Sequence, residues 1–305
     1  MKNSNQHVCK ARNIGSIASE ILSKDQDALV FGITSKGVYV KTSSRWLVFL
    51  SFDPFRGPLT ITLDEVSSTL QLLGAGRPVH LTSQSISIPD VDIIISITGS
   101  QVWQPADPSP IQLDNPERHQ ILVRVANEVI SNEVFIKKTG VGLGGYLPLI
   151  LGSPNAHPPP RLVNNIDWGD VQQLGYYLRN REALPLAKLL SDILGAGPGL
   201  TPSADDFVIG LLLSLNRWQK PFWSADSLRS LNDQLVKAAY LKTTTLSANL
   251  IECATLGWAD ERLINALDLL VTGIAREPEI VAHLLGWGHS SGVDAFVGMA
   301  VSLTA

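Results

Sequence analysis

The hydrophobic pattern of this 305-residue chain changes its period near residue 112, and this change constrains the fold more than any other feature. Before it, short β-branched and aromatic runs are separated by turn residues, which is typical of strands. After it, apolar residues recur every three to four positions, which is typical of helices that bury one face. We therefore expect an α+β protein with a β-rich module, residues 1–112, followed by a mainly helical domain, residues 113–305.

The expected strands of the N-terminal module are short and closely spaced. They cover residues 28–33, 37–41, 45–50, 59–63, 85–88 and 91–97. Residues 35–37 and 42–44 have the length of hairpin connections, which join neighbouring antiparallel strands. We therefore expect an antiparallel module that is barrel-like or sandwich-like.

The helical part follows a stretch rich in Pro and Asp, residues 104–116, which has the composition of a linker. Pro116 lies in the first turn of an expected helix that runs to about Ser131. Further expected helices cover residues 171–179, 183–194, 203–218, 227–241, 247–257, 260–272, 278–285 and 291–303. Gly-rich residues 139–145 lack the spacing of a dinucleotide-binding loop, so we expect a tight turn or a second wall of a site.

Composition excludes several classes of function. The formal net charge is -4, and no run of basic residues indicates a nucleic-acid or anionic-membrane surface. The first residues lack the apolar region of a secretory signal, and the most apolar stretch, residues 207–215, is too short to span a bilayer. The two cysteines fit a reducing compartment. We expect a soluble cytoplasmic protein with neither a nucleic-acid nor a membrane partner.

Residues 194–207, LGAGPGLTPSADDF, are unlike the rest of the chain. The three glycines let the main chain approach a ligand closely, and the loop feeds an apolar helix. Free N–H groups at a helix N-terminus favour a bound anion, as does the helix dipole. The expected anion contacts in this segment are Gly197, Gly199, Thr201 and Ser203. The alternative is that Ser203 and Asp206 only form a capping box.

A second segment repeats this pattern. Residues 291–302 can be laid over residues 203–214, and four positions agree in residue type. The matched pairs are Ser203 and Ser291, Asp206 and Asp294, Gly210 and Gly298, and Ser214 and Ser302. Since glycine lets helices approach closely, we expect the two helices to pack through Gly210 and Gly298, with their N-termini side by side. The alternative is chance similarity between two capped helices.

Polar residues near two further helix starts complete the candidate site. Lys242, Thr244 and Ser247 are expected anion contacts because lysine can pair with phosphate or carboxylate as a point charge. Taken alone, this segment also fits a Thr-rich cap beside a solvated lysine. Residues 288–291 precede the second helix, and we expect Ser290 and Ser291 to contact the anion there. His289 is a candidate acid or base near neutral pH, although a histidine in a loop is more often simply exposed.

Three carboxylates lie at the two helix starts. Asp205 and Asp206, together with His289, are the expected catalytic residues. Asp205, Asp206 and Asp294 are also candidate ligands for Mg²⁺ or another divalent metal, because hard cations prefer oxygen ligands.

Residues 195–206, GAGPGLTPSADD, resemble the signature of the AllH family, which includes a subunit of the oxamate carbamoyltransferase of allantoin degradation. Supporting matches are Thr244-x-x-Ser247, GHSSGVD at residues 288–294, and RGPL at residues 56–59, so the resemblance covers most of the chain. Ala204 stands where the family usually has glycine. Its methyl group in the first helical turn narrows the approach of the loop to a ligand.

The resemblance implies conversion of oxalurate and phosphate to oxamate and carbamoyl phosphate, in purine catabolism and with other carbamoyltransferase subunits as partners. Small anionic substrates suit clustered helix N-termini. The family also has members outside any allantoin pathway, so the resemblance supports the fold and the site more strongly than the reaction. The alternative is a non-catalytic binding or assembly subunit that uses the same Gly-rich loop to contact a partner chain.

Overall fold

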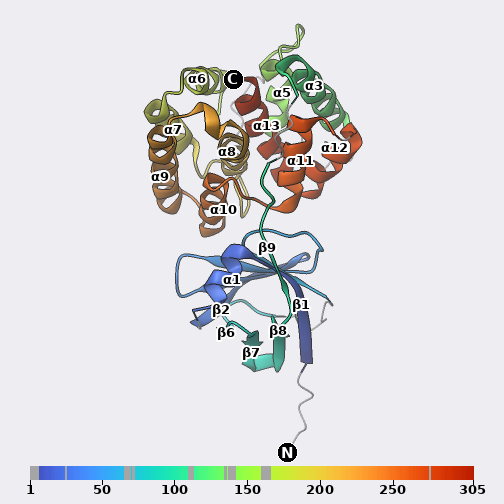
Figure 1. Ribbon diagram of the computed structural model, residues 1–305, viewed down its shortest axis with the longest axis vertical. Helices are drawn as coiled ribbons and strands as arrows, with labels where there is room; N and C mark the ends of the chain where they lie inside the picture. Colours follow the sequence, from blue (N-terminus) through green and yellow to red (C-terminus); the bar gives the residue numbers. More distant parts are fainter. Residues whose placement is uncertain are drawn as a thin grey trace, which may run out of the picture. The chain divides into compact units, whose positions relative to one another are not determined.

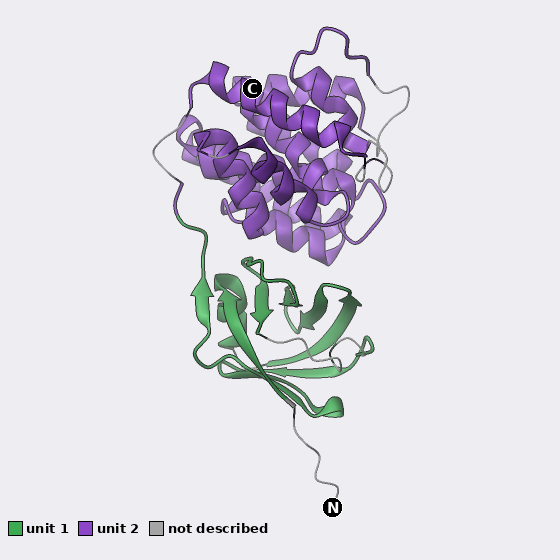
Figure 2. Cartoon of the chain, turned by 90° about the vertical axis from the view of Figure 1, so that its right-hand side faces the viewer, with its two compact units in different colours: residues 1–106 green, residues 107–305 purple. Residues whose placement is uncertain are grey.

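The computed structural model describes residues 7–24, 26–64, 70, 73–108, 113–133, 136, 142–158, 166–274 and 276–305. They divide into two compact units, residues 1–106 and residues 107–305 (Figure 2). Strands build the first unit and helices build the second, so the expected β module followed by a mainly helical region is confirmed. The expected linker and the expected Gly-rich turn fall partly on residues 109–112 and 137–141, which lie outside the described residues.

Unit 1 is a closed β-barrel. Its strands are β1 His7–Gly15, β2 Gln26–Thr34, β3 Gly37–Thr42, β4 Leu47–Ser51, β5 Thr60–Leu63, β6 Pro78–Leu81, β7 Ser85–Ile88, β8 Ile93–Ser96 and β9 Gln101–Trp103. The strand order is β5-β4-β3-β2-β6-β7-β8-β1, and pairing of β1 with β5 closes the ring while β9 adds to the free end of β1. Closure removes the unpaired edges that an open sheet would expose.

The barrel is mixed rather than antiparallel throughout, which corrects the expected pairing. Strand β1 pairs in parallel with β8 and β9, and β4 pairs in parallel with β5. Hairpin lengths cannot indicate these pairings, because their partners are distant in sequence or joined by longer connections. Strands β1, β6 and β9 were not among the expected strands. In β1 the charged residues Lys10 and Arg12 interrupt the apolar pattern, and β6 and β9 are only four and three residues long.

The RGPL segment has a packing role within unit 1. Helix α1, Ser16–Leu22, begins directly after Gly15, and a Cβ on Gly15 would lie 2.1 Å from the carbonyl oxygen of Gly57. The amide of Ala18 donates to the carbonyl of Pro58 at 3.0 Å. The guanidinium of Arg56 lies over the ring of Trp103, 5.6 Å from its centroid. This segment therefore holds the turn between β1 and α1.

Unit 2 is helical. Its elements are α3 Asn115–Ser131, η2 Gly142–Tyr146, α5 Leu147–Ile150, α6 Trp168–Asn180, α7 Ala183–Ile193, α8 Ser203–Ser214, η3 Leu215–Gln219, η4 Lys220–Phe222, α9 Ala225–Lys242, α10 Thr245–Thr255, α11 Glu261–Thr272, α12 Glu277–Gly286 and α13 Ser291–Thr304. Every expected helix is confirmed to within a few residues, and α8 continues into a π-helical turn, η3. Within the described ranges, no helix is both long and apolar enough to cross a bilayer.

Helices α8 and α13 form the centre of unit 2. All residues of α8 after Ser203 are buried, and so are residues 292–303 of α13. Figure 1 shows the pair between α6, α7, α9 and α10 on one side and α3, α11 and α12 on the other. A helix that is apolar on every side needs such surroundings. The repeated sequence pattern therefore corresponds to the two core helices of the unit.

Two local features shape the surface at the end of α6 and after α8. Helix α6 ends at Arg181, a non-glycine residue in the left-handed region with φ 57°, where glycine is the usual residue and a side chain costs about 1 kcal/mol. In η3, Arg217 makes two 2.7 Å hydrogen bonds to Asp268, and the indole N–H of Trp218 donates to the same carboxylate at 2.8 Å. These bonds fix the direction in which the chain leaves α8.

Candidate functional site

Gly210 and Gly298 bring the two central helices into backbone contact. A Cβ on Gly210 would lie 1.9 Å from the carbonyl oxygen of Ala295, and a Cβ on Gly298 would lie 2.0 Å from that of Phe207. The two contacts are reciprocal, because each glycine meets the residue that follows the aspartate of the other repeat. The expected packing of the helices through these glycines is therefore confirmed.

Crossed hydrogen bonds tie the first turns of the two helices. Ser203 on α8 bonds to the carboxylate of Asp294 on α13, and Ser291 on α13 bonds to the carboxylate of Asp206 on α8. Thr201, just before α8, places its hydroxyl 3.3 Å from Asp206 Oδ2 and 3.2 Å from the Ser291 hydroxyl. The two helix N-termini therefore lie side by side, as the repeat predicts.

Ser203 and Asp206 do not form a capping box. The residue before α8 is Pro202, and no side-chain hydrogen bond caps the helix. The amides of Asp205 and Asp206 bond to the carbonyl of Pro202 at 2.9 and 3.1 Å. Because the neighbouring helix start supplies a hydroxyl and a carboxylate, both side chains bond across to α13 instead of to their own helix.

Asp205 anchors the Gly-rich loop and does not join the crossed cluster. Its buried carboxylate accepts the amide of Gly195 at 2.8 Å and the hydroxyl of Thr243. Gly195 has φ +80°, and a Cβ there would lie 2.6 Å from the carbonyl oxygen of Lys242. The carboxylate of Asp205 therefore fastens the start of the loop to the segment between α9 and α10.

The carboxylates of Asp206 and Asp294 are almost fully buried, at 1 % and 2 % exposure, and each keeps one buried oxygen with no partner in the described part of the chain. Burial raises the pKa of Asp294 to about 6. Hydrogen bonds from Ser203, Ser290 and the Leu143 amide lower this pKa, but their effect is smaller than that of burial. Burial also raises the pKa of Asp206 well above its ordinary value, and the nearby negative charges of Asp294 and Asp205 add to this shift. Carboxyl groups of this kind can hold a proton near neutral pH.

The loop before α8 is open to solvent. Gly197, Pro198, Gly199 and Leu200 are exposed, and both glycines adopt positive φ angles, 117° and 103°. Hydrogen bonds hold its two ends, from the Ala196 amide to Ile193 and from the Ala204 amide to Ala196. Among the described residues, no acceptor is recorded for the amides of Gly197, Gly199 and Leu200. These three donors are therefore available to a ligand.

The remaining expected anion contacts are placed differently. Thr244 caps α10 by accepting the amide of Ser247, and its hydroxyl donates to the loop carbonyl of Leu200 at 2.7 Å. Ser247 is buried. The ammonium of Lys242 turns to the end of α7, where it donates to the carbonyl of Ser191 at 2.8 Å. The Thr-rich cap is thus present, and the structure does not bring Lys242 to the helix starts.

The turn before α13 carries His289 and Ser290. Gly288 has φ +68°, and a Cβ there would lie 2.7 Å from the Ser291 hydroxyl. His289 is exposed, whereas Ser290 bonds to the carboxylate of Asp294. The structure therefore brings together six of the expected residues, which are Thr201, Ser203, Asp206, Ser290, Ser291 and Asp294.

The described part of the Gly-rich stretch, residues 142–145, forms one wall of the site, which the sequence predicted only as one of two alternatives. The described part, η2, packs beside α13, and the backbone amide of Leu143 donates to Asp294. A Cβ on Gly142, which has φ +51°, would lie 3.7 Å from Asp294 Oδ1. Neither Leu143 nor Thr243 was among the expected site residues. The only sequence signals for them are the glycine run and the threonine run in which they lie.

The donor set does not fit a metal held by all three aspartates. Within the described ranges, no group of three or more His, Cys, Asp or Glu side chains is arranged to hold an ion. Asp205 uses its two oxygens for Gly195 and Thr243, which leaves Asp206 and Asp294 as the carboxylates with an open oxygen.

Comparison with known protein families gives a match to the part of the chain that contains this site. Residues 193–303 match the model of the family described as oxamate carbamoyltransferase subunit AllH. This segment is similar to the AllH family. The matched segment contains the Gly-rich loop, both central helices and every residue of the crossed hydrogen bonds. No solved structure matches the chain.

The raised pKa of Asp294 predicts a pH-dependent stability. A carboxyl group whose pKa is higher in the folded state stabilises the fold at low pH, and this contribution is lost as the pH rises through the folded value. The shift from 3.8 to about 6 corresponds to about 3 kcal/mol between pH 4 and pH 7. Urea titrations between pH 4 and pH 7 give the free energy of unfolding at each pH. In the Asp294→Asn variant, the fall of this free energy with rising pH should be smaller by that amount. Parallel pH profiles for the two proteins would contradict the assignment.

Proposed function

We propose that this chain is a subunit of an oxamate carbamoyltransferase and that the paired starts of α8 and α13 bind its small anionic substrates. The family match supports a transferase subunit that works with partner subunits. The open loop amides beside two aligned helix starts support the anion site. This second observation carries the proposal, because it supplies donors that the protein does not use itself.

The recognition step uses main-chain donors. The amides of Gly197, Gly199 and Leu200 can donate to carboxylate or phosphate oxygens, and the partial positive charge of two helix N-termini adds to them. Oxalurate, oxamate, phosphate and carbamoyl phosphate are all anions of this kind. The glycines matter because their positive φ angles give the loop a backbone course that residues with side chains rarely adopt.

The chemical step requires one proton to move. A phosphate oxygen attacks the carbamoyl carbon of oxalurate, the carbon–nitrogen bond to oxamate breaks, and the leaving nitrogen gains the proton that phosphate loses. The carboxyl group of Asp206, whose pKa burial raises, can pass that proton as general acid and base. Ser291 positions this carboxyl group by a hydrogen bond from α13, and the nearby charge of Asp294 helps to raise its pKa.

A non-catalytic assembly subunit is the second candidate. Leu200, in the same loop, is 54 % exposed, and Leu241 at the end of α9 is 86 % exposed. Exposed leucines mark a surface that contacts another protein where they join into one apolar patch. In this case the loop would bind a partner chain and the open amides would pair with it.

Thermal unfolding of the purified chain separates the two candidates. At about ten times their dissociation constants, phosphate, oxamate or carbamoyl phosphate should raise the melting temperature by about 3 °C, because they bind only the folded state. Gly199→Ala should abolish the shift, since the residue has φ +103° and carries a loop amide. Gly152→Ala is the matched control, because Gly152 has φ +71° and open space around it. A shift with a partner subunit and none with these anions would favour assembly.

A further inference from the structure

Unit 2 contains a second cavity that the proposed carbamoyl-transfer site does not use. It has a volume of about 690 Å³ and is lined by the start of α3, the end of α6, the segment after α8 and the end of α13. None of the loop residues or crossed serines and aspartates lines it. Its volume lies within the range of small-molecule pockets and is larger than a phosphate or an oxamate would fill.

The charged side chains around this cavity are guanidiniums. Arg118, Arg179 and Arg181 line it, and no Asp or Glu side chain does. In the described part of the chain, none of the three forms an ion pair. Arg118 is half-buried, and this burial lowers its pKa, while Asp114 at the start of α3 acts in the opposite direction. The guanidinium of Arg118 also donates to the Asn115 side chain and to the carbonyl of Leu303. Arg179 and Arg181 are therefore the two lining guanidiniums that the described residues leave without an acidic neighbour, and such arginines favour an anionic ligand.

Arg181 occupies a backbone conformation that glycine would adopt more easily. Its φ of 57° places it in the left-handed region at the end of α6, and its amide closes the helix on Leu178 and Tyr177. Capping of the helix needs only the backbone of this residue. The arginine side chain is therefore not required by the turn, and it lines the cavity beside Arg179.

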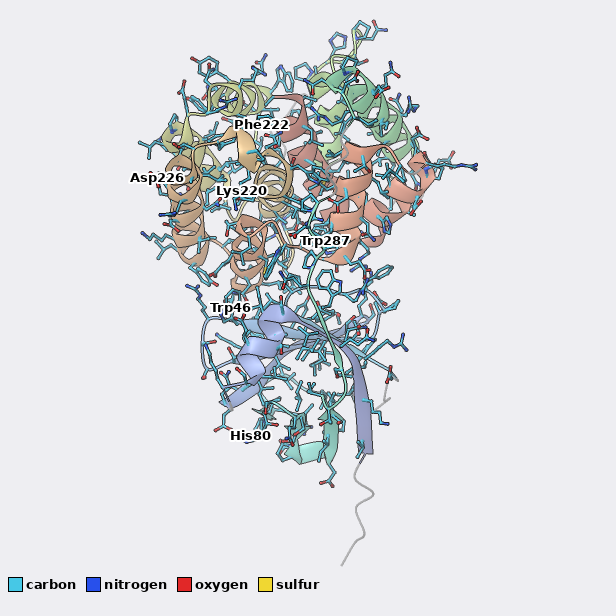
Figure 3. All side chains as sticks on the ribbon, in the orientation of Figure 1. Trp46, His80, Lys220, Phe222, Asp226 and Trp287 are labelled. Carbon is cyan, nitrogen blue, oxygen red and sulfur yellow. The ribbon has the colours of Figure 1, made fainter. Side chains whose placement is uncertain are left out.

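Aromatic side chains form another part of the wall. Trp218, Phe222 and Trp223 line the cavity. The hydrogen bond to Asp268 fixes the ring of Trp218. Phe222 is 59 % exposed, and Figure 3 labels it on the segment that follows α8. Trp218 and Trp223 are buried, so Phe222 is the exposed ring of this wall. An exposed ring that lines the same cavity as guanidiniums can stack on a planar group while the cations hold its charges.

We infer that this cavity binds an organic polyanion with a planar ring, which is the chemistry of a nucleoside phosphate. The guanidiniums pair with the phosphate oxygens, and the aromatic wall holds the ring. The cavity is a separate site from the paired helix starts, so the inference stands whether or not those bind the substrates of a carbamoyltransferase.

Calorimetric titration of the full chain with ADP tests this site, with adenosine and pyrophosphate as the ring-only and charge-only probes. We expect ADP to bind, and to bind more tightly than either probe alone. Arg181→Gly removes the guanidinium and relieves the left-handed backbone, so the variant should fold and bind ADP about tenfold more weakly or worse. Arg229→Ala is the control, because Arg229 lies on α9, is 73 % exposed and does not line the cavity.

Three results would overturn the inference. They are no heat of binding with millimolar ADP, an equal affinity for ADP in the Arg181→Gly variant, and an affinity for pyrophosphate equal to that for ADP. The last result would remove the aromatic wall from the recognition. Melting temperatures of the two variants, measured alongside, separate a loss of binding from a loss of folding.

Discussion

Replacing Gly298 with alanine is expected to lower the free energy of unfolding of unit 2 by about 3 kcal/mol or more, the upper end of overpacking effects. The added Cβ would lie 2.0 Å from the carbonyl oxygen of Phe207 and 2.8 Å from the amide nitrogen of Leu211. Both atoms belong to the backbone of α8, so no side chain can move aside, and the helices must separate along the centre of the core. Urea unfolding followed by circular dichroism measures the change.

Gly175→Ala provides the matched control for this effect. Gly175 also lies within a helix, α6, but a Cβ there would first meet the end of the Arg179 side chain at 3.4 Å. Alanine is the better helix former by about 1 kcal/mol, so this variant should be as stable as the parent or more stable. If both alanine variants unfold at the same urea concentration, the close approach of α8 and α13 is wrong.

Asp206→Asn is expected to reduce kcat of the assembled enzyme about a hundredfold or more, because asparagine cannot transfer a proton. The variant keeps an acceptor oxygen for Thr201 and Ser291 and removes a buried carboxyl group, so its stability should change by no more than about 1 kcal/mol. Formation of carbamoyl phosphate from oxalurate and phosphate, in the presence of the partner subunits, measures the rate.

Replacing the neighbouring aspartate, Asp205, should affect stability more than activity. Asp205→Asn replaces the carboxylate that accepts the amide of Gly195 and the hydroxyl of Thr243, and we expect it to cost about 2 kcal/mol of stability. Activity per folded molecule should fall less than in Asp206→Asn. If Asp206→Asn is fully active, the general acid and base lies elsewhere, and His289 is the next residue to replace.

The sequence was most informative where one local pattern determined a contact. Gly210 and Gly298 have no side chain and lie at equal distances from Asp206 and Asp294, so their packing could be predicted from spacing alone. The positions of the helices could also be predicted from the sequence, because each helix buries a face whose apolar residues repeat with the helical period. The α+β class followed from the same patterns.

The sequence was less informative where the partner of a residue lies far along the chain. A serine three residues before an aspartate at a helix start predicts a local cap, and only the three-dimensional structure shows Ser203 bonding to Asp294 instead. The roles of Asp205 and Lys242 also depend on where other loops pass. In unit 1, parallel pairing of β1 with β8 depends on barrel closure, which no local turn indicates.

The most direct test of the anion site is a titration of the glycine-labelled protein with phosphate and oxamate, followed in amide ¹⁵N–¹H spectra. We expect the signals of Gly197 and Gly199 to shift in proportion to the bound fraction, while those of Gly76 and Gly152, which also have positive φ angles, stay in place. If the signals of Gly197 and Gly199 do not move at saturating anion, the loop is not the binding site and the proposed mechanism fails with it.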